Sequence, residues 1–398
     1  MKLAIISPGF VPVPAVKGGA VEQLIEYIVT ANELYHKYDI DLYTVDDPLL
    51  NNFTYKYTNL IKVPSKSKIN LYSRIFVKSK KIMGKLLNLS NDYDYTSTVF
   101  LKYYKKNYYD AVLVENNMDI YGNLLSVVTK EKLYFHLHND VDCGDPSKTK
   151  EKTEKIINTS KNILVVSQFL KKKLCKMGAT NVTVVPNAII SKNFKQNSLE
   201  KVTEIRSKYG IRKNDFVFTF VGRLAPEKGI DKLISAIKRL NYVPNIKCLI
   251  VGKNFFEDKS GNRYISYLKN ISQDVQSKLI FTGYIPNNKL NDIYSISNCV
   301  VIPSQWEEVF GVVALEAMEM KCPVIASYSG GLPEVLSKKC ALFVKRDKNF
   351  IINLSDKMKL IMNDSILRNN LATNGYKRSR QFPQNESEYY KLISSVIK

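Results

Sequence analysis

Two glutamates and the short stretch between them could act on a phosphorylated ligand. Glu308 precedes a segment with the pattern of a helix, and Glu316 follows eight positions later, inside that segment. The two carboxylates would lie roughly 8–12 Å apart along the helix. Free backbone N–H groups near Phe310 and Gly311 fall between them, at a helix end that attracts phosphate. A nucleotide sugar fits this order, because it carries hydroxyl groups on both sides of its diphosphate.

A second sequence motif, the string GRLAPEKG, supplies positive charge. Arg223 and Lys228 stand five positions apart in the string GRLAPEKG, between an apolar run at 216–221 and a helical segment at 230–240. Breaking a sugar–diphosphate bond leaves a dianion, which a guanidinium fork and an ammonium group can stabilise. Across a strand-to-helix turn the two side chains can converge on one diphosphate, although an isolated Arg–Lys pair is more often a surface feature.

The elements that must position these groups alternate between short apolar strands and helices, and the alternation occurs twice. This pattern predicts an α/β chain with two parallel sheets. Strands are expected in the first half at 3–7, 40–44, 111–115, 132–138, 163–166 and 182–185. In the second half they are expected at 216–221, 248–251, 279–282, 299–302 and 324–327.

The first half offers two more pairs of candidate residues. Gly18 and Gly19 lie in a strand-to-helix loop, where backbone amides could approach a ligand, although a structural turn is the more frequent role of such a pair. His136 and His138 point to one face of a strand, at the carboxyl end where ligands of open α/β sheets bind. A hydrogen-bonded structural histidine is an equally good interpretation of either one.

Composition indicates a soluble globular chain with room for two domains. It has 398 residues, 45% of them hydrophobic and 24% charged. No apolar run reaches 18 residues, so no transmembrane helix is expected, and the N-terminus has the pattern of a buried strand rather than of a secretion signal. Six scattered cysteines without a C-x-x-C pair favour free thiols in a reducing cytosol.

A net charge of +22 suggests an anionic partner. The stretch 56–106 carries twelve Lys and Arg against only Asp92 and Asp94, with tyrosines interleaved. An anionic membrane face would suit this charge, and solvated lysines in a biased composition explain it equally well. An amphipathic helix at 71–83 could lie on a membrane, but an ordinary helix with one core face is favoured. No nucleic-acid motif accompanies the charge, so no nucleic-acid partner is expected.

The stretch from Pro303 to Val335 resembles the signature of family 4 retaining glycosyltransferases, which have the GT-B fold. It contains two glutamates separated by seven residues, then P-V-I-A and G-G-x-P-E, and GRLAPEKG resembles the family's phosphate-binding element. The resemblance covers nearly the whole chain and is most specific in the second half. It implies two Rossmann-like domains facing a central cleft: an acceptor-side domain at 1–190, a nucleotide-sugar domain at 191–380, and a helix at 381–398 that crosses back to the first.

The resemblance also implies residue roles. Arg223 and Lys228 would neutralise the departing diphosphate, Glu308 and His138 would hold the sugar, and Glu316 would bind the ribose. No metal is expected, because the D-x-D string at 140–142 matches a motif of a different fold only by coincidence. Further substrate contacts are implied at Gly18, Gly19, His136 (the reserve for His138), Asn187, Gly222, Gly283, Val309, Phe310 and Gly311.

The expected function is a metal-independent retaining glycosyltransferase. It would move a hexose from a nucleotide sugar, by family preference a UDP-sugar, to a hydroxyl of a glycan or lipid-linked acceptor in surface polysaccharide synthesis. The expected location is cytoplasmic, with a peripheral position at the inner face of the plasma membrane as an option for the basic first half. Two alternatives remain: a non-catalytic GT-B-like protein that binds sugar nucleotides or glycans, and a basic nucleic-acid-binding protein.

Overall fold

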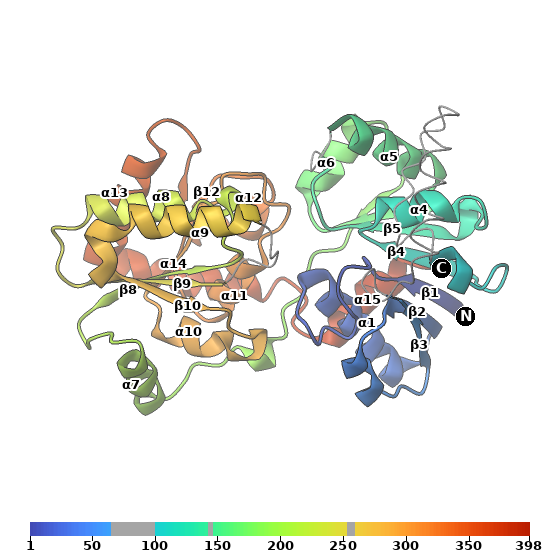
Figure 1. Cartoon of the computed structure of the whole chain (residues 1–398), viewed down its shortest axis with the longest axis horizontal. Coiled ribbons are helices and arrows are strands. Elements are labelled where there is room, and N and C mark those ends of the chain that lie inside the picture. Colours follow the sequence, from blue (N-terminus) through green and yellow to red (C-terminus); the bar gives the residue numbers. More distant parts are fainter. Residues whose placement is uncertain (65–99, 142–145, 253–258) are drawn as a thin grey trace. The chain divides into compact units, whose positions relative to one another are not determined.

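The computed structural model describes residues 1–64, 100–141, 146–252 and 259–398 of the chain (Figure 1). The chain forms two compact units, one of Met1–Ala188 with Glu386–Lys398 and one of Ile189–Asn385. The sequence placed the domain limits at 190 and 380. The amphipathic helix expected at 71–83 lies outside the described residues, as does the second aspartate of the D-x-D string at 140–142.

A parallel sheet forms the centre of the first unit. Within the described residues it has seven strands in the order β3-β2-β1-β4-β5-β6-β7. Strands β4 and β5 pair in a register that sets Glu115 opposite His136. Both strands are buried along their whole length, as expected where helices cover the two faces of a parallel sheet. The strands are β1 (Lys2–Ile6), β2 (Asp39–Val45), β3 (Thr58–Val63), β4 (Ala111–Glu115), β5 (Leu133–Leu137), β6 (Asn162–Val165) and β7 (Val182–Val184).

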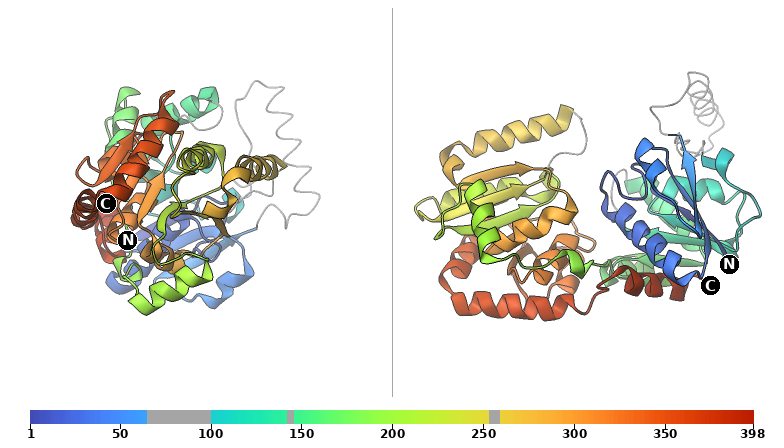
Figure 2. Two further views of the ribbon diagram at one scale, coloured as in Figure 1. Left: turned by 90° about the vertical axis from the view of Figure 1, so that its left-hand side faces the viewer. Right: turned by 90° about the horizontal axis from the view of Figure 1, so that it is seen from below.

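Helices α1 and α15 pack against each other in the first unit, although they come from opposite ends of the chain (Figures 1 and 2). Ile25 and Ile28 of α1 share a buried cluster with Tyr389 and Ile393 of α15. Another packed pair consists of α4 and α5. The helices of this unit are α1 (Ala20–Tyr35), α4 (Met118–Leu124), α5 (Pro146–Thr159), α6 (Gln168–Lys176) and α15 (Glu386–Val396).

The second unit is built around another parallel sheet. Its six strands, counted over the described residues, run in the order β10-β9-β8-β11-β12-β13. They are β8 (Phe216–Val221), β9 (Ile246–Val251), β10 (Leu279–Gly283), β11 (Cys299–Ile302), β12 (Val324–Ser327) and β13 (Ala341–Val344). The helices are α7 (Leu199–Lys208), α8 (Ile230–Arg239), α9 (Lys259–Ile271), α10 (Leu290–Ile296), α11 (Val312–Glu319), α12 (Leu332–Val335), α13 (Phe350–Asn363) and α14 (Ser365–Ser379).

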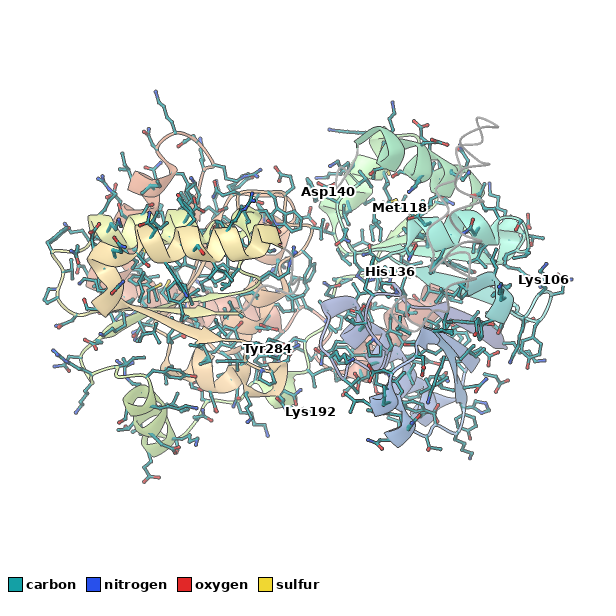
Figure 3. The ribbon with its side chains drawn as sticks, in the orientation of Figure 1. Lys106, Met118, His136, Asp140, Lys192 and Tyr284 are labelled. Atoms are coloured by element: carbon teal, nitrogen blue, oxygen red, sulfur yellow. The ribbon has the colours of Figure 1, made fainter. Side chains whose placement is uncertain are left out.

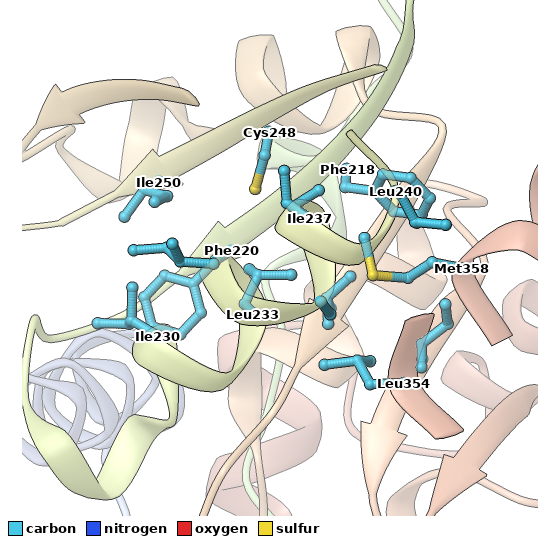
Figure 4. Close-up of a cluster of buried hydrophobic side chains, with 14 of the residues drawn as sticks. Phe218, Phe220, Ile230, Leu233, Ile237, Leu240, Cys248, Ile250, Leu354 and Met358 are labelled. Carbon is cyan, nitrogen blue, oxygen red and sulfur yellow. The ribbon is translucent and has the colours of Figure 1, made fainter. Parts of the chain in front are cut away.

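The helices of the second unit cover both faces of its sheet and are held there by a buried hydrophobic core. Helices α8 and α9 lie on one side of the sheet and α10 on the other (Figure 1). Helix α8 repeats apolar residues at helical spacing, and these pack on alternate side chains of β8 and on α13 (Figure 4). The buried cluster includes Phe218, Phe220, Ile230, Leu233, Ile237, Leu354 and Met358. Among the described helices, none is long and apolar enough to cross a membrane.

Candidate functional site

The two charged strings of the sequence, GRLAPEKG and the stretch that begins at Pro303 and holds Glu308, meet in the second unit. The ammonium of Lys228, in the turn after β8, donates a hydrogen bond to Oε1 of Glu308 at 2.7 Å. The hydroxyl of Ser304 donates to the same oxygen at 2.6 Å. Burial alone would raise the pKa of the Glu308 carboxyl, but the charge of Lys228 and these hydrogen bonds outweigh burial and lower the pKa. Glu308 is therefore an ionised and fixed carboxylate at neutral pH.

A glycine lets the two strings dock. Gly229 has a φ of +71°, and a Cβ there would lie 2.0 Å from the carbonyl oxygen of Pro303. The backbone N–H of Gln305 donates to the carbonyl of Glu227 at 2.8 Å. The turn after β8 and the loop after β11 are thus in direct backbone contact, and a side chain at position 229 would separate them.

An aromatic ring and a second cation complete this cluster. The Lys228 ammonium lies 4.7 Å from the ring centroid of Trp306, the chain's only tryptophan. Arg223 pairs with Glu227 at 3.1 Å, and its side chain is 37% exposed. A phosphate oxygen could replace the carboxylate as a partner of this guanidinium, because an exposed ion pair is weak.

The start of α11 follows directly after these groups. Gly311 is the residue before the helix, with a φ of +92°, and no side chain caps the first N–H groups. Phe310 is buried and meets the ring of Phe382 edge-on, so any contact of Phe310 with a ligand must come from its backbone. Val309 is half-buried. The N–H groups at this helix end have no side-chain cap, and binding of a phosphate there stays a prediction.

Glu316 lies inside α11 in quite different surroundings. The hydroxyl of Tyr294, from α10, donates to its Oε2 at 2.6 Å. Burial raises the pKa of the Glu316 carboxyl to about 7, and the hydrogen bond from Tyr294 only partly opposes this effect. Tyr294 was not anticipated from the sequence, because no spacing rule connects α10 to α11.

Glycines stand where three neighbouring strands of the second unit end. Gly222 follows β8, Gly252 follows β9, and Gly283 closes β10. The N–H of Gly252 donates to the carbonyl of Gly283 at 2.9 Å, and a Cβ at 252 would lie 1.8 Å from the carbonyl oxygen of Gly222. Gly222 and Gly283 were expected at the site, whereas Gly252 was not, although a glycine directly after a buried strand is a usable signal.

The two histidines of the first unit share one carboxylate. Nε2 of His138 lies 2.8 Å from Oε2 of Glu115, and Nδ1 of His136 lies 3.1 Å from the same oxygen. His136 is part of the sheet layer, whereas Lys106 reaches into solvent (Figure 3). Burial would raise the pKa of the Glu115 carboxyl, but the charge of His136 and both hydrogen bonds lower it to about 2. Burial and the charge of His136 lower the pKa of His138 to about 4.

The remaining predicted residues of the first unit lie around the start of α1 and after β7. Gly19 precedes α1, and a Cβ there would lie 2.1 Å from Oε2 of Glu22. Burial raises the pKa of the Glu22 carboxyl to about 7. Gly18 also has a positive φ. Asn187 is buried, and its Oδ1 has no hydrogen-bond partner within the described structure.

The predicted residues thus form two sets, one in each unit. Arg223, Lys228, Glu308, Glu316 and the N-terminus of α11 belong to the second unit, and the glycine pair, both histidines and Asn187 belong to the first. A cavity of about 390 Å³ in the second unit is lined by other residues. They include Lys192, Lys195, Lys321 and Arg380.

Three first-unit residues could converge on a metal ion. The ligand atoms of Glu115, His136 and His138 all lie within 4.8 Å of one another. Two imidazoles and a carboxylate suit zinc or iron. Here the Glu115 oxygen pairs with both imidazoles instead, so the ligand atoms satisfy one another. Independence from metal stays a prediction.

Comparisons with known proteins bear on the fold and the family of the chain. Residues 201–378 match the family described as Glycosyl transferases group 1. The protein YtcC of Bacillus subtilis (strain 168) is 25% identical over 95% of this chain and 87% of its own length. The lipopolysaccharide 1,2-N-acetylglucosaminetransferase of Salmonella typhimurium is 30% identical over 56% of each chain.

A solved structure extends the likeness to both units. Anabaena Alr3699/HepE in complex with UDP is 16% identical, with a TM-score of 0.71 over 100% of this chain and 99% of that one. This likeness shows the fold. Two Rossmann-like units with parallel sheets give the chain the GT-B fold, and the group 1 match within the second unit supports a glycosyltransferase.

Proposed function

We propose that the protein is a retaining glycosyltransferase of family 4 type that moves a hexose from a UDP-sugar to a hydroxyl group without a metal ion. The observation that carries this proposal is the contact between Lys228 and Glu308, at 2.7 Å, beside the N-terminus of α11. It joins a group suited to phosphate with a group suited to sugar hydroxyls. Each belongs to a string that was identified independently in the sequence.

Each group has a part in the proposed reaction. Arg223 and Lys228 stabilise the negative charge that grows on the departing diphosphate, together with the free N–H groups of α11. Glu308 accepts hydrogen bonds from the hexose, and Glu316 from the ribose. His138 binds a hydroxyl of the hexose.

Retention follows from a front-face route in this proposal. The carboxylate of Glu308 is held by Lys228 and Ser304, which suits binding of hydroxyls better than attack on the anomeric carbon. The leaving phosphate oxygen takes the proton of the acceptor hydroxyl. The new glycosidic bond forms on the face from which the C–O bond to phosphate breaks, so the anomeric configuration is kept.

Relatives support the substrate classes of the proposal. The Salmonella protein is named as a transferase of N-acetylglucosamine to lipopolysaccharide, and the Anabaena protein binds UDP. We extend these to a UDP-sugar donor and to an acceptor in a surface glycan, free or lipid-linked. A lipid-linked acceptor would favour a peripheral position at the membrane, which the basic stretch 56–106 could support.

Donor hydrolysis tests the proposal without knowledge of the acceptor. The protein, treated with a chelator, is mixed with a panel of UDP-α-hexoses, and proton NMR follows the released sugar before it mutarotates. Release of the α-anomer from one donor is the expected result. Release of the β-anomer would exclude retention, and a strict requirement for added metal would exclude the metal-free route.

A further inference from the structure

Glu115, His136 and His138 form a deeply buried cluster of ionisable side chains in the first unit. Glu115 is 1% exposed, His136 0% and His138 7%. A carboxylate in such a place is strongly destabilising unless cations or hydrogen-bond donors surround it. Within the described structure the side chain of Glu115 pairs with the two imidazoles, so its placement depends on them and theirs on it.

The sheet itself creates this arrangement. Glu115 is the last residue of β4 and pairs in register with His136 of β5. His138 lies two positions further along, where side chains return to the same face. The carboxylate therefore meets both imidazoles at the carboxyl edge of the sheet, where ligands of such folds bind.

The backbone of His138 is anchored from the same loop. Asn116 has a positive φ of 54°, and its side-chain oxygen accepts the N–H of His138 at 3.0 Å. The N–H of Asn116 donates to the carbonyl of His136 at 2.9 Å. The ring and the main chain of His138 are thus fixed by two consecutive residues, Glu115 at the end of β4 and Asn116 directly after it.

The hydrogen bond also selects one tautomer. An ionised carboxylate only accepts hydrogen bonds, so the proton of a neutral His138 ring must be on Nε2, the nitrogen 2.8 Å from Glu115. Nδ1 then carries a lone pair and can accept a hydrogen bond from a sugar hydroxyl. His136 is fully buried with an unpartnered Nε2, which suits a supporting role rather than contact with a ligand.

We infer that Glu115 is a positioning residue, which fixes the ring orientation and the tautomer of His138 so that Nδ1 keeps its lone pair for a hydrogen bond from a sugar hydroxyl. The inference rests on the proposed function for its substrate. Glu115 itself does not touch the reacting atoms. It holds the imidazole that binds the sugar, as the buried carboxylate of a catalytic triad holds its histidine.

Spectroscopy tests the inference without an activity assay. The chain has only three histidines, so the ring nitrogens can be assigned by ¹⁵N NMR in the intact protein. At pH 7 His138 should be in the Nε2–H form. Glu115→Leu, which offers no acceptor, should convert it to a mixture or to the Nδ1–H form, while Glu115→Gln, which keeps one acceptor, should retain most of the Nε2–H form. An unchanged Nε2–H form in Glu115→Leu would overturn the inference.

Binding and turnover provide the second readout. Trp306 fluorescence reports UDP and UDP-glucose binding, and UDP release reports hydrolysis. Glu115→Leu should bind UDP as the wild type does but lose roughly tenfold to hundredfold in kcat/KM for the hexose donor, with a smaller loss in Glu115→Gln. Glu131→Gln, an exposed carboxyl just before β5, should match the wild type in both assays.

The outcomes separate the two levels of the argument. A wild-type protein that neither binds UDP nor releases it from any UDP-hexose contradicts the proposed function, and the NMR experiment still decides whether Glu115 sets the tautomer. Wild-type turnover with unchanged kinetics in both Glu115 variants contradicts the inference alone. Turnover that disappears on chelation and returns with Zn²⁺ would also overturn it, since the three side chains would then be metal ligands.

Discussion

At the scale of single residues, the two glutamates of the second unit are prepared for different tasks. Glu308 meets Lys228 and Ser304, and these partners lower the pKa of its carboxyl. The carboxyl of Glu316 accepts a hydrogen bond from Tyr294, and burial raises its pKa to about 7. One acid stays ionised at neutral pH, whereas the other titrates close to it. Such contrasts between neighbouring acids are typical of functional sites.

Glu308→Gln should reduce turnover of the hexose donor by roughly a hundredfold, because the charge that pairs with Lys228 and receives the sugar hydroxyls is lost. The neighbouring Glu307→Gln is the control. Glu307 pairs with Arg346 and accepts the N–H of Gly330, so its role is to hold the loop. UDP release from the two variants is compared under one set of conditions, and equal losses would count against the assignment of Glu308.

Glu316 should make the stability of the second unit depend on pH. Its pKa is raised from 4.5 to about 7, so the folded state holds this proton more tightly than the unfolded chain does. Its contribution to stability is present below pH 4.5 and is lost as the pH rises through 7. Glu316→Gln should therefore gain about 3 kcal/mol relative to the wild type between pH 4.5 and pH 8.

Urea unfolding at a series of pH values measures this difference. Glu204→Gln, an exposed position on α7, should follow the wild-type curve throughout. A difference between Glu316→Gln and the wild type that stays constant with pH would show that Glu316 does not titrate in this range.

Sequence reasoning located the charged strings but not the residues that orient them. The motif glutamates and the Arg–Lys string stand out because their types and spacing suit one ligand. The residues that orient the site are Glu115, Tyr294 and Ser304. Glu115 and Tyr294 contact residues that are distant in the chain. Ser304 is close to Glu308 in the chain, but only the fold of the loop brings its hydroxyl to the carboxylate. Only the register of β4 with β5 brings Glu115 to the histidines, and no periodicity in the sequence encodes that register.

At the scale of elements, the turn after β8 determines whether the two strings meet. Its contact with the loop after β11 depends on Gly229, where a Cβ would overlap the carbonyl of Pro303. The backbone hydrogen bond between Gln305 and Glu227 lies beside this glycine. The geometry of the site is therefore a property of two loops docked on each other, each held by a buried strand.

Gly229→Ala should destabilise the second unit by about 2–4 kcal/mol, since backbone atoms must move apart as well as accept a strained φ. Gly210→Ala is a matched control, because Gly210 also has a positive φ, of +62°, but has open space around its Cβ position. Its expected loss is about 1 kcal/mol. Urea unfolding measures both, and UDP binding should weaken only in Gly229→Ala. Equal effects of the two changes would contradict the docking role.

The central strands of both sheets were predictable from the sequence, and so were the edge strands β7 and β10, but the other two edge strands were not. The central strands are continuous apolar runs, and β8, β11 and β12 begin and end where the sequence indicated. Neither β3 nor β13 was expected. They lie at the edges of their sheets and are partly exposed, so their apolar pattern is weaker. The polar helix α5 was missed because its apolar positions are few.

At the scale of the whole molecule, the chain returns to its first unit at its end. Helix α15 packs on α1, and the last residues complete the first hydrophobic core. Periodicity alone predicted a helix near the C-terminus, whereas its return was implied only by resemblance to a family. The packing partner of a terminal amphipathic helix cannot be derived from its own sequence.

Ile393→Ala should weaken the first unit. Ile393 is fully buried between α15 and its neighbours, and loss of such a side chain costs about 2–5 kcal/mol. Leu392→Ala changes a neighbouring residue that is 37% exposed, and it should be nearly neutral. Hydrogen exchange should show faster exchange of α1 amides in Ile393→Ala but not of β8 amides. Equal protection of α1 in both variants would contradict the packing described here.

The most direct test of the central claim is a nucleotide titration of the intact protein. Thermal unfolding is followed with UDP, GDP and ADP in the presence of a chelator, for the wild type, Arg223→Ala and the exposed control Arg212→Ala. One nucleotide, expected to be UDP, should stabilise the wild type and Arg212→Ala by about 2.7 kcal/mol at a hundred times its Kd. The stabilisation should be absent in Arg223→Ala. No shift with any nucleotide, or an equal shift in Arg223→Ala, would contradict a donor site built from the two strings.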